Sequence, residues 1–290
     1  MTADSIALSI SGKPKDIGGF EVRRLLPVAR CRSVGAFVFL DHMGPVTLKA
    51  GQGMDVLPHP HIGLATLTYL FEGSILHRDS LGSVQEIFPG DVNLMTAGCG
   101  IVHSERSSDE SRSMDREVHG LQMWVALPKE HEEMPPAFSH TPKLVLPDLS
   151  GEGWHGCLIV GSLFGATSPV ETMSRFFFAD IRVESDVSIP ITPDYDEAAV
   201  YVVEGELDID GAIVEAGTLA VLEKNPNVTL KSRQETIFVV LGGDTLPEPR
   251  FMYWNFVSTS KERIERAKDD WQEQRFDGVP GDTSFVPLPQ

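Results

Sequence analysis

Two short segments of the chain carry the residues with the clearest capacity for chemistry. His59 and His61 stand two residues apart, and His103 and Glu105 repeat that spacing with an imidazole and a carboxylate. Side chains at positions i and i+2 of a β-strand point to the same face. If the two segments are antiparallel neighbours inside a β-barrel, we expect three imidazoles and one carboxylate to meet at one point.

Three nitrogens and one oxygen form a donor set for a single divalent metal ion. Structural zinc prefers four closed tetrahedral positions, often with thiolates, whereas donors on a rigid barrel wall can leave octahedral positions open. Fe(II), Mn, Ni and Cu are therefore candidates, with Zn as a further possibility. Cys99, four residues before His103, is interpreted as a small buried residue of a tight loop, outside the site. The remaining histidines lack a comparable partner at i+2 and are interpreted as structural: His42, His77, His119, His131, His140 and His155.

Other catalytic motifs fail on their context. The glycines at 151, 153 and 156 match the dinucleotide-binding pattern, but they follow a proline-rich segment and precede a strand-like run. His131-Glu132 begins like a zinc-protease helix, yet Pro135 occupies the position of the second histidine. These observations argue against a nucleotide-binding protein and a metalloprotease.

The elements that must position the donor pairs are predicted to be strands. The 26 glycines and 20 prolines among 290 residues favour many turns and short strands. Short apolar runs rich in Val, Ile, Phe and Thr recur between these turns. The predicted strands are Ala36–Leu40, Thr66–Phe71, Val92–Met95, Leu121–Ala126, Leu158–Val160, Phe176–Ile181, Val200–Val203, Leu219–Leu222 and Ile237–Leu241.

One helix is predicted near the C-terminus. Thr259 and Glu262 have the spacing of a capping box, and Ile264, Ala267 and Trp271 follow on one helical face. A single apolar stripe of this kind is typical of a helix that packs on its own core. We therefore expect an all-β fold with a short C-terminal helix.

A proline-rich stretch divides the chain. Five prolines fall between Pro128 and Pro147, and proline cannot donate to a central sheet ladder. We interpret this stretch as an extended connector. The predicted domains are residues 1–135, with the metal ligands, and residues 136–290, without them.

The two halves share a pattern that indicates duplication. Tyr69–Ile75 and Tyr201–Leu207 both contain a strand, a Glu-Gly turn and the start of a second strand. The offset of 132 falls to 127 at Gly90 and Gly217, because the intervening hairpin is shorter. Applied to the four donors, the offsets lead to residues that do not bind metal in the usual way, namely Ile191, Pro193, Leu230 and Ser232. We expect the second barrel to be structural.

Charge and cysteine content restrict the partners and the compartment. The formal net charge of −18 disfavours direct binding to nucleic acid or to an anionic membrane, because both need clustered Lys and Arg. The sequence shows no apolar stretch of membrane-spanning length. Its three cysteines are too sparse for a disulfide framework and suit a reducing compartment. We expect a cytoplasmic protein.

Several motifs closely resemble the pirin family. The resemblance is carried by Pro58–Leu64, Thr68–Gly73, His77–Gly82 and Pro89–Glu105, with further likeness in Phe39–His42 and Tyr253–Ser258. It implies a bicupin, with two cupin-type β-barrels, of which the first binds one mononuclear metal, usually Fe(II). The ligands that it implies are His59, His61, His103 and Glu105.

The resemblance also implies two alternative functions. Family members are described as dioxygenases that open flavonols such as quercetin, and as regulators that bind a transcription factor or a metabolic enzyme. For the enzyme, the partners would be a small aromatic substrate and O2, and Glu105 would take the substrate proton. Departures from the common family pattern at Ile62, Ala65 and Cys99 make the mouth of the predicted pocket less polar.

Overall fold

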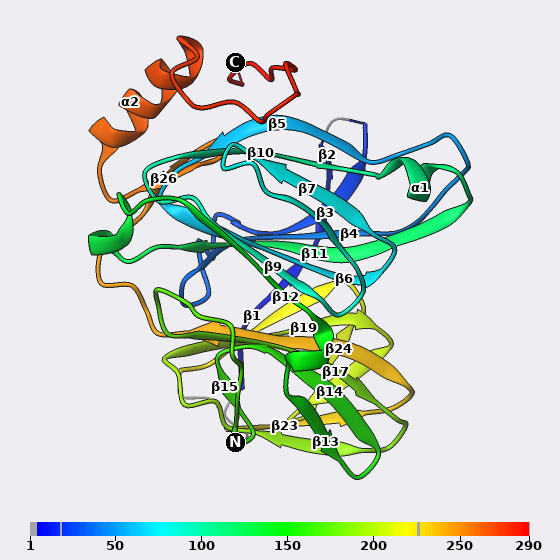
Figure 1. The fold of residues 1–290 in the computed structure, drawn as a ribbon. Coiled ribbons are helices and arrows are strands. Elements are labelled where there is room, and N and C mark those ends of the chain that lie inside the picture. The colour runs from blue at the N-terminus through cyan, green and yellow to red at the C-terminus, as the bar shows by residue number, and fades with distance from the viewer. Residues whose placement is uncertain (1–4, 18, 225–226, 290) are drawn as a thin grey trace. The chain divides into compact units, whose positions relative to one another are not determined.

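The computed structural model describes residues 5–17, 19–224 and 227–289, and within them the chain consists mainly of antiparallel strands (Figure 1). Contacts divide the chain into two compact units, each assembled from separate segments. We call residues 14–23, 39–143 and 247–290 the histidine-rich unit, and residues 1–13, 24–38 and 144–246 the aliphatic unit. β-branched and aromatic runs bounded by glycine and proline favour this strand-rich architecture.

The histidine-rich unit contains two facing sheets. Apolar side chains from both sheets, including Leu70, Ile87 and Val118, form a buried core between them. The seven-stranded sheet has the order β12 (Ala137–Thr141), β9 (Val92–Thr96), β6 (Leu64–Glu72), β11 (Arg116–Ala126), β4 (Phe37–Leu48), β3 (Glu21–Leu26) and β2 (Lys13–Asp16). The four-stranded sheet has the order β5 (Asp55–His61), β10 (Ile101–Arg106), β7 (Ile75–Asp79) and β8 (Val84–Ile87).

The C-terminal segment of the same unit covers the outer face of this four-stranded sheet. The hairpin of β25 (Phe251–Tyr253) and β26 (Phe256–Ser258) leads into α2 (Lys261–Gln272), drawn in orange in Figure 1. The apolar face of α2 packs in one cluster with Ile62 and Val102. The remaining short elements are α1 (Asp109–Arg112) and the 3-10 turns η1 (Lys129–His131) and η2 (Lys143–Val145).

The aliphatic unit repeats the arrangement of two sheets. Its core contains Phe177, Leu230 and Phe238, contributed by both sheets. The seven-stranded sheet has the order β1 (Ile6–Ser11), β22 (Thr218–Leu222), β19 (Glu197–Glu204), β24 (Thr236–Gly243), β17 (Phe176–Val183), β14 (Trp154–Val160) and β13 (Asp148–Gly151). The second sheet has the order β18 (Ser188–Ile191), β23 (Val228–Ser232), β20 (Glu206–Ile209) and β21 (Ala212–Glu215), and β15 (Ser162–Leu163) pairs with β16 (Ala166–Thr167).

The strand predictions agree with the structure, whereas the proline-rich segment differs in part. Each of the predicted apolar runs overlaps a strand. The predicted connector contains a strand, β12, because residues 137–141 are free of proline and pair with the edge strand β9. The compact units also differ from the continuous division into 1–135 and 136–290: β1 pairs with β22, and residues 247–290 belong to the histidine-rich unit.

Helix α2 is confirmed, but its first residue is shifted. Ser260 is the N-cap, and its hydroxyl accepts a hydrogen bond from the backbone N–H of Arg263 at 3.1 Å. The predicted cap, Thr259, instead donates its backbone N–H to the carboxylate of Glu132 at 2.9 Å. Ile264, Ala267 and Trp271 are buried as predicted. No helix in the described part of the chain combines the length and the apolar character that crossing a membrane requires.

Candidate metal centre

Adjacent antiparallel strands present the two predicted donor pairs to the interior of the histidine-rich unit. His103 of β10 is paired with His59 of β5, and Ile101 is paired with His61. This confirms the predicted antiparallel neighbours. An irregularity in the pairing follows His103, so that Glu105 lies opposite Val56.

Tight turns hold the ends of these strands in place. The backbone N–H of Gly63, just after β5, donates to the carbonyl of Gly98 at 2.9 Å, which joins that turn to the turn before β10. Gly63 has φ +67°, and a Cβ atom there would lie 2.0 Å from the carbonyl oxygen of Val257. Only glycine tolerates both conditions. The close approach fixes the position of His61, two residues earlier.

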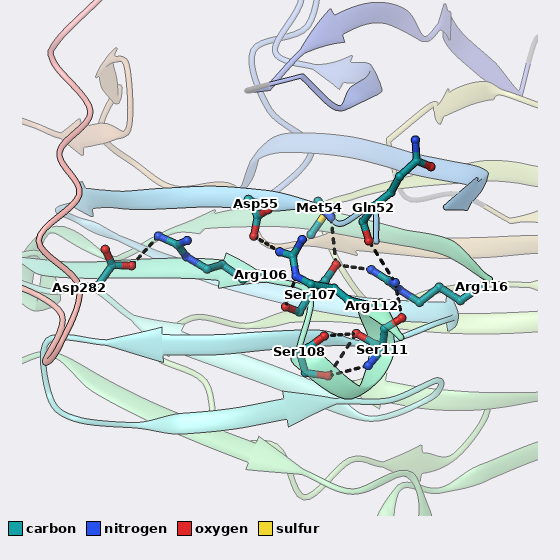
Figure 2. A network of polar contacts seen from close by, with 10 residues as sticks. All are labelled: Gln52, Met54, Asp55, Arg106, Ser107, Ser108, Ser111, Arg112, Arg116 and Asp282. Atoms are coloured by element: carbon teal, nitrogen blue, oxygen red, sulfur yellow. Dashed lines mark hydrogen bonds and ion pairs between the residues drawn. The ribbon is translucent and has the colours of Figure 1, made fainter. Parts of the chain in front are cut away.

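A polar network anchors the other end of β10, next to Glu105 (Figure 2). Arg106 donates to Asp282 at 2.6 Å, and the Ser107 hydroxyl accepts the backbone N–H of Met54 at 2.9 Å. Arg112 and Arg116 add hydrogen bonds to Asp55, Ser107 and Ser111. These contacts connect β10 to the chain before β5 and to the C-terminal segment, so the strand cannot shift its register easily.

The side chains of His59, His61 and His103 converge, and we call them the histidine triad. One ring nitrogen of each lies within 4.8 Å of the others, and Nε2 of His61 is 3.1 Å from Nε2 of His103. His61 and His103 have no exposed surface, and His59 is 9% exposed. In the part of the chain that the structure describes, this is the one group of three or more His, Cys, Asp or Glu residues with ligand atoms so close together.

Hydrogen bonding and burial give the triad the form that binds metals. The carbonyl of Leu57 accepts the Nδ1–H of His59 at 2.8 Å, which leaves the lone pair on Nε2. Burial lowers the pKa of His59 to about 4 and holds the pKa values of His61 and His103 well below their usual range. All three imidazoles are therefore neutral at pH 7, as metal ligation requires.

The distances within the triad fit one metal ion. Two nitrogens bound at right angles to an ion, each at about 2.1 Å, are about 3.0 Å apart. The 3.1 Å between the Nε2 atoms of His61 and His103 agrees with this value. Imidazole donors suit Zn, Cu, Fe and Ni, so the geometry is suited to a single metal without selecting its identity.

Glu105 lies in the same interior and is held by neutral groups. Its carboxylate accepts hydrogen bonds from the Thr68 hydroxyl at 3.2 Å and from the Gln122 amide at 3.3 Å. Burial raises the pKa of Glu105. A carboxylate with few charged partners and a raised pKa is suited to proton transfer. Its role as the fourth metal ligand stays a prediction.

Two aromatic side chains form a flat wall beside the triad. Trp124 of β11 stacks on Phe39 of β4 with a ring-centroid distance of 3.9 Å and an interplanar angle of 10°. The same Trp124 meets His61 edge to face at 5.2 Å. Because Gln122 and Trp124 are two residues apart on β11, both point into the interior. Neither residue was singled out from the sequence.

His77 was also interpreted as structural, yet the structure places it beside the triad. Its Nδ1 is 3.4 Å from Nδ1 of His103, and its Nε2 is 3.0 Å from the carboxylate of Asp79. The missed signal was the His-x-Asp spacing on β7, the same i, i+2 pattern as the two donor pairs. The register of β7 against β10, with Asp79 opposite His103 and His77 opposite Glu105, could not be read from the sequence.

The other histidines lie outside the triad. His42 and His119 form a buried pair, with their Nε2 atoms 2.8 Å apart, and His140 bonds to Asn93 at 2.8 Å. Burial lowers the pKa of His42 to about 3. Cys99 lies in the loop before β10, but it is exposed, so the expectation of a buried cysteine is wrong.

The aliphatic unit has a cavity of about 300 Å³ that is lined by different chemistry. Arg175 lies in it, bonded to Asp194 and Asp244 and stacked on Tyr195 at 4.5 Å. Arg175, Asp194 and Asp244 are thus paired with one another in the wall of the cavity, and we prefer the triad as the candidate functional site.

Comparisons with known proteins agree with this description. Residues 19–125 match the model of the Pirin family, and residues 178–277 match the Pirin C-terminal cupin domain. A Pirin-like protein of Caulobacter vibrioides is 44% identical over 289 residues, covering 98% of this chain and 100% of the relative. A Pseudomonas aeruginosa relative, whose name gives quercetin 2,3-dioxygenase as an unproven activity, is 39% identical over 94% of this chain and 87% of its own length.

A solved structure shows the same fold. The crystal structure of quercetin 2,3-dioxygenase from Acinetobacter baumannii superposes with a TM-score of 0.93 at 32% identity, covering 100% of this chain and 97% of the other. The two units are thus two cupin-type barrels, as expected for a bicupin.

Proposed function

The chain belongs to the pirin family, and from that premise we propose that it is a metal-dependent dioxygenase that opens the ring of flavonols such as quercetin with O2. The observation that carries the proposal is the buried, neutral histidine triad, whose spacing fits a single divalent ion. The dioxygenase names of two similar proteins supply the substrate class.

The triad would hold the ion, with Glu105 as the proposed fourth ligand. A divalent metal there, most consistently Fe(II), with Mn, Ni, Cu or Zn as alternatives, would offer open positions where an enol oxygen and O2 come together. Among the triad residues, His59 alone keeps some exposed surface, and the side chain of Leu57 nearby is 37% exposed. We therefore place the entry for the substrate on the side of His59.

The interior supplies orientation and proton transfer. Glu105 would take the proton of the flavonol hydroxyl, provided that the substrate oxygen lies within about 3 Å of the carboxylate. Thr68 and Gln122 hold that carboxylate by hydrogen bonds that leave it uncompensated by a positive charge. The flat wall of Trp124 and Phe39 is suited to stacking against an aromatic ring.

The test combines metal analysis with oxygen uptake. Metal-free protein is loaded separately with Fe(II), Ni(II) or Mn(II), and O2 consumption with quercetin is followed at an oxygen electrode. We expect uptake that depends on the metal and that falls by about 100-fold or more in Glu105→Gln, since general base catalysis contributes 10²–10⁴-fold. Glu130→Gln, an exposed carboxylate, is the matched control.

The metal content of each sample decides how the result is understood. Protein that holds a metal but consumes no O2 with any flavonol would contradict the dioxygenase and favour a metal-dependent regulator. Loss of metal from Glu105→Gln would instead support its role as a ligand.

A further inference from the structure

A second ionisable pair stands directly behind the histidine triad. His77 and Asp79, both on β7, are 3% and 0% exposed, and His77 contacts His103 across the sheet. The ring of His77 also stacks on Phe138 at 4.3 Å with an interplanar angle of 13°, which fixes its plane. The pair is therefore rigid and close enough to influence one triad member.

Both oxygens of Asp79 have assigned partners. Oδ1 accepts the backbone N–H groups of Leu81 at 2.9 Å and Ser83 at 3.0 Å, whereas Oδ2 faces Nε2 of His77 at 3.0 Å. Burial acts to raise the pKa of Asp79, but the hydrogen bonds from His77 and Ser83 outweigh it and the pKa lies below its usual value. Two backbone N–H groups and the His77 ring surround the Asp79 carboxylate, which accepts from all three, so His77 carries its proton on Nε2.

This protonation propagates to His103. Nδ1 of His77 faces Nδ1 of His103 at 3.4 Å, and with its proton on Nε2 the His77 ring offers the Nδ1 lone pair at this contact. A hydrogen bond between these atoms requires His103 to donate from Nδ1. Its own lone pair then lies on Nε2, the atom that faces His61 at 3.1 Å.

We propose that Asp79 and His77 are positioning residues that fix the tautomer of His103, so that its Nε2 lone pair is directed to the metal position. Metal-bound histidines commonly donate their second ring N–H to such a partner, and loss of the partner typically weakens metal binding 10–100-fold. The proposal rests on the proposed function for the metal that the triad holds, but the tautomer exists in the metal-free protein as well.

Asp79→Asn is a specific test, because it keeps the shape and reverses the hydrogen bonds. The backbone donors of Leu81 and Ser83 require the amide oxygen at the Oδ1 position, so the amide NH2 must face His77. His77 would then be protonated on Nδ1, and His103 would be forced to accept there and to carry its proton on Nε2. A residue that served only for packing would not produce this reversal.

Two measurements follow the prediction. Nitrogen-15 NMR of the metal-free protein reports which ring nitrogen of each histidine is protonated, and we expect His103 to change from Nδ1–H to Nε2–H in Asp79→Asn. The Ni(II) dissociation constant, measured in competition with a chromophoric chelator, is expected to rise 10–100-fold. Asp91→Asn is the matched control, since Asp91 also accepts backbone N–H groups, from Phe88 and Lys143, in the same unit.

The outcomes separate this inference from the proposed function. If the wild-type protein carries the His103 proton on Nε2, the inference is wrong, and this result needs no variant to fold. Equal Ni(II) affinity of the wild type and a folded Asp79→Asn would also overturn it, while leaving the dioxygenase intact. A wild type that binds no metal would contradict the proposed function, whereas the NMR measurement would still decide the tautomer.

Discussion

The two four-stranded sheets have the same strand order, but the side chains that face the interior are polar in one unit and apolar in the other. In the histidine-rich unit, His103 of β10 pairs with His59 of β5, whereas in the aliphatic unit Leu230 of β23 pairs with Ile189 of β18. The next strand continues the contrast, because β7 presents His77 and Asp79, and β20 presents residues such as Leu207. The same backbone therefore carries a polar centre in one unit and a closed apolar core in the other.

The outer faces of these sheets differ as well. Along β10 the five residues 101–105 are all buried, whereas β23 alternates between buried and exposed positions. The C-terminal segment, with Trp271 of α2, covers the outer face of β5 and β10. A metal site requires its histidine nitrogens to be positioned to within about 0.5 Å. Strands that are packed on both faces are rigid enough to hold side chains with this precision. Aliphatic side chains tolerate a sheet with one solvated face.

The largest effect is expected when the histidines of the first sheet are replaced by the aliphatic residues found in the second sheet. We expect the combined variant His59→Ile, His61→Ile and His103→Leu to fold, because aliphatic side chains need no buried hydrogen-bond partners, and to lose its metal completely. Elemental analysis after dialysis and circular dichroism measure the two properties. His140→Ala, whose side chain bonds to Asn93 away from the triad, should keep the metal. A full metal complement in the combined variant would remove the basis for the site.

The second prediction concerns the cover of the outer face. Glu132 forms a buried ion pair with Arg250 at 3.2 Å and accepts hydrogen bonds from Ser258 and Thr259 at the start of α2. Glu132→Ala removes the closest carboxylate from the buried Arg250, which keeps only hydrogen bonds to the carbonyls of Leu127 and Glu248 and a longer ion pair with Glu248. The loss should lower the free energy of unfolding by about 3–5 kcal/mol. Urea denaturation measures the change.

The exposed neighbour Glu130→Ala is the control for that experiment, with an expected change within about 0.5 kcal/mol. An equal loss in both variants would show that the ion pair does not hold the C-terminal segment in place.

The smallest expected effect per residue is a difference in acid sensitivity between the units. The lowered pKa values of His42, about 3, and His59, about 4, mean that the unfolded chain binds protons that the folded chain does not. Protonation of the unfolded chain therefore lowers the free energy of unfolding as the pH falls below 6.5, by about 2 kcal/mol for each histidine at pH 5 in the metal-free protein. Glu105, with its raised pKa, opposes this trend.

Segment-resolved hydrogen exchange at pH 7 and pH 5 tests this sensitivity. Protection should fall in β5 and β10 more than in β18 and β23, where the corresponding residues do not titrate. Earlier loss of protection in the aliphatic unit would contradict the comparison.

The sequence predicted the donor pairs because their information is local. The spacing of His59 and His61, and of His103 and Glu105, follows from the two-residue period of a strand. The internal repeat also placed Leu230 and Ser232 correctly opposite β20. For the other strand the predicted counterparts of the histidines, Ile191 and Pro193, were wrong by two residues. The register instead aligns Ile189 and Ile191 with His59 and His61. The cause is the longer turn after β18, which spans residues 192–196, whereas the turn after β5 spans residues 62–63.

Long-range contacts explain what the sequence did not predict. The partners of Glu105, namely Thr68 and Gln122, come from two other strands, and no local pattern links them. The assignment of β1 and of residues 247–290 to their units depends on pairing across the whole chain. Such contacts depend on which strands pair and in which register. The periodicity of apolar residues predicts strands and helices, but it does not predict their partners.

The C-terminal cover of β5 and β10 has a consequence for the order in which the protein is made. A ribosome completes the histidine triad at His103, but the residues that bury the outer face of these strands begin at about Phe251. At about 5–20 residues per second, the roughly 150 intervening residues take about 7–30 s. During that interval β5 and β10 are synthesised but remain uncovered, while residues 144–246 of the aliphatic unit are made. Tight capture of a metal by the triad would therefore follow the synthesis of the covering residues, such as Phe256 and Trp271.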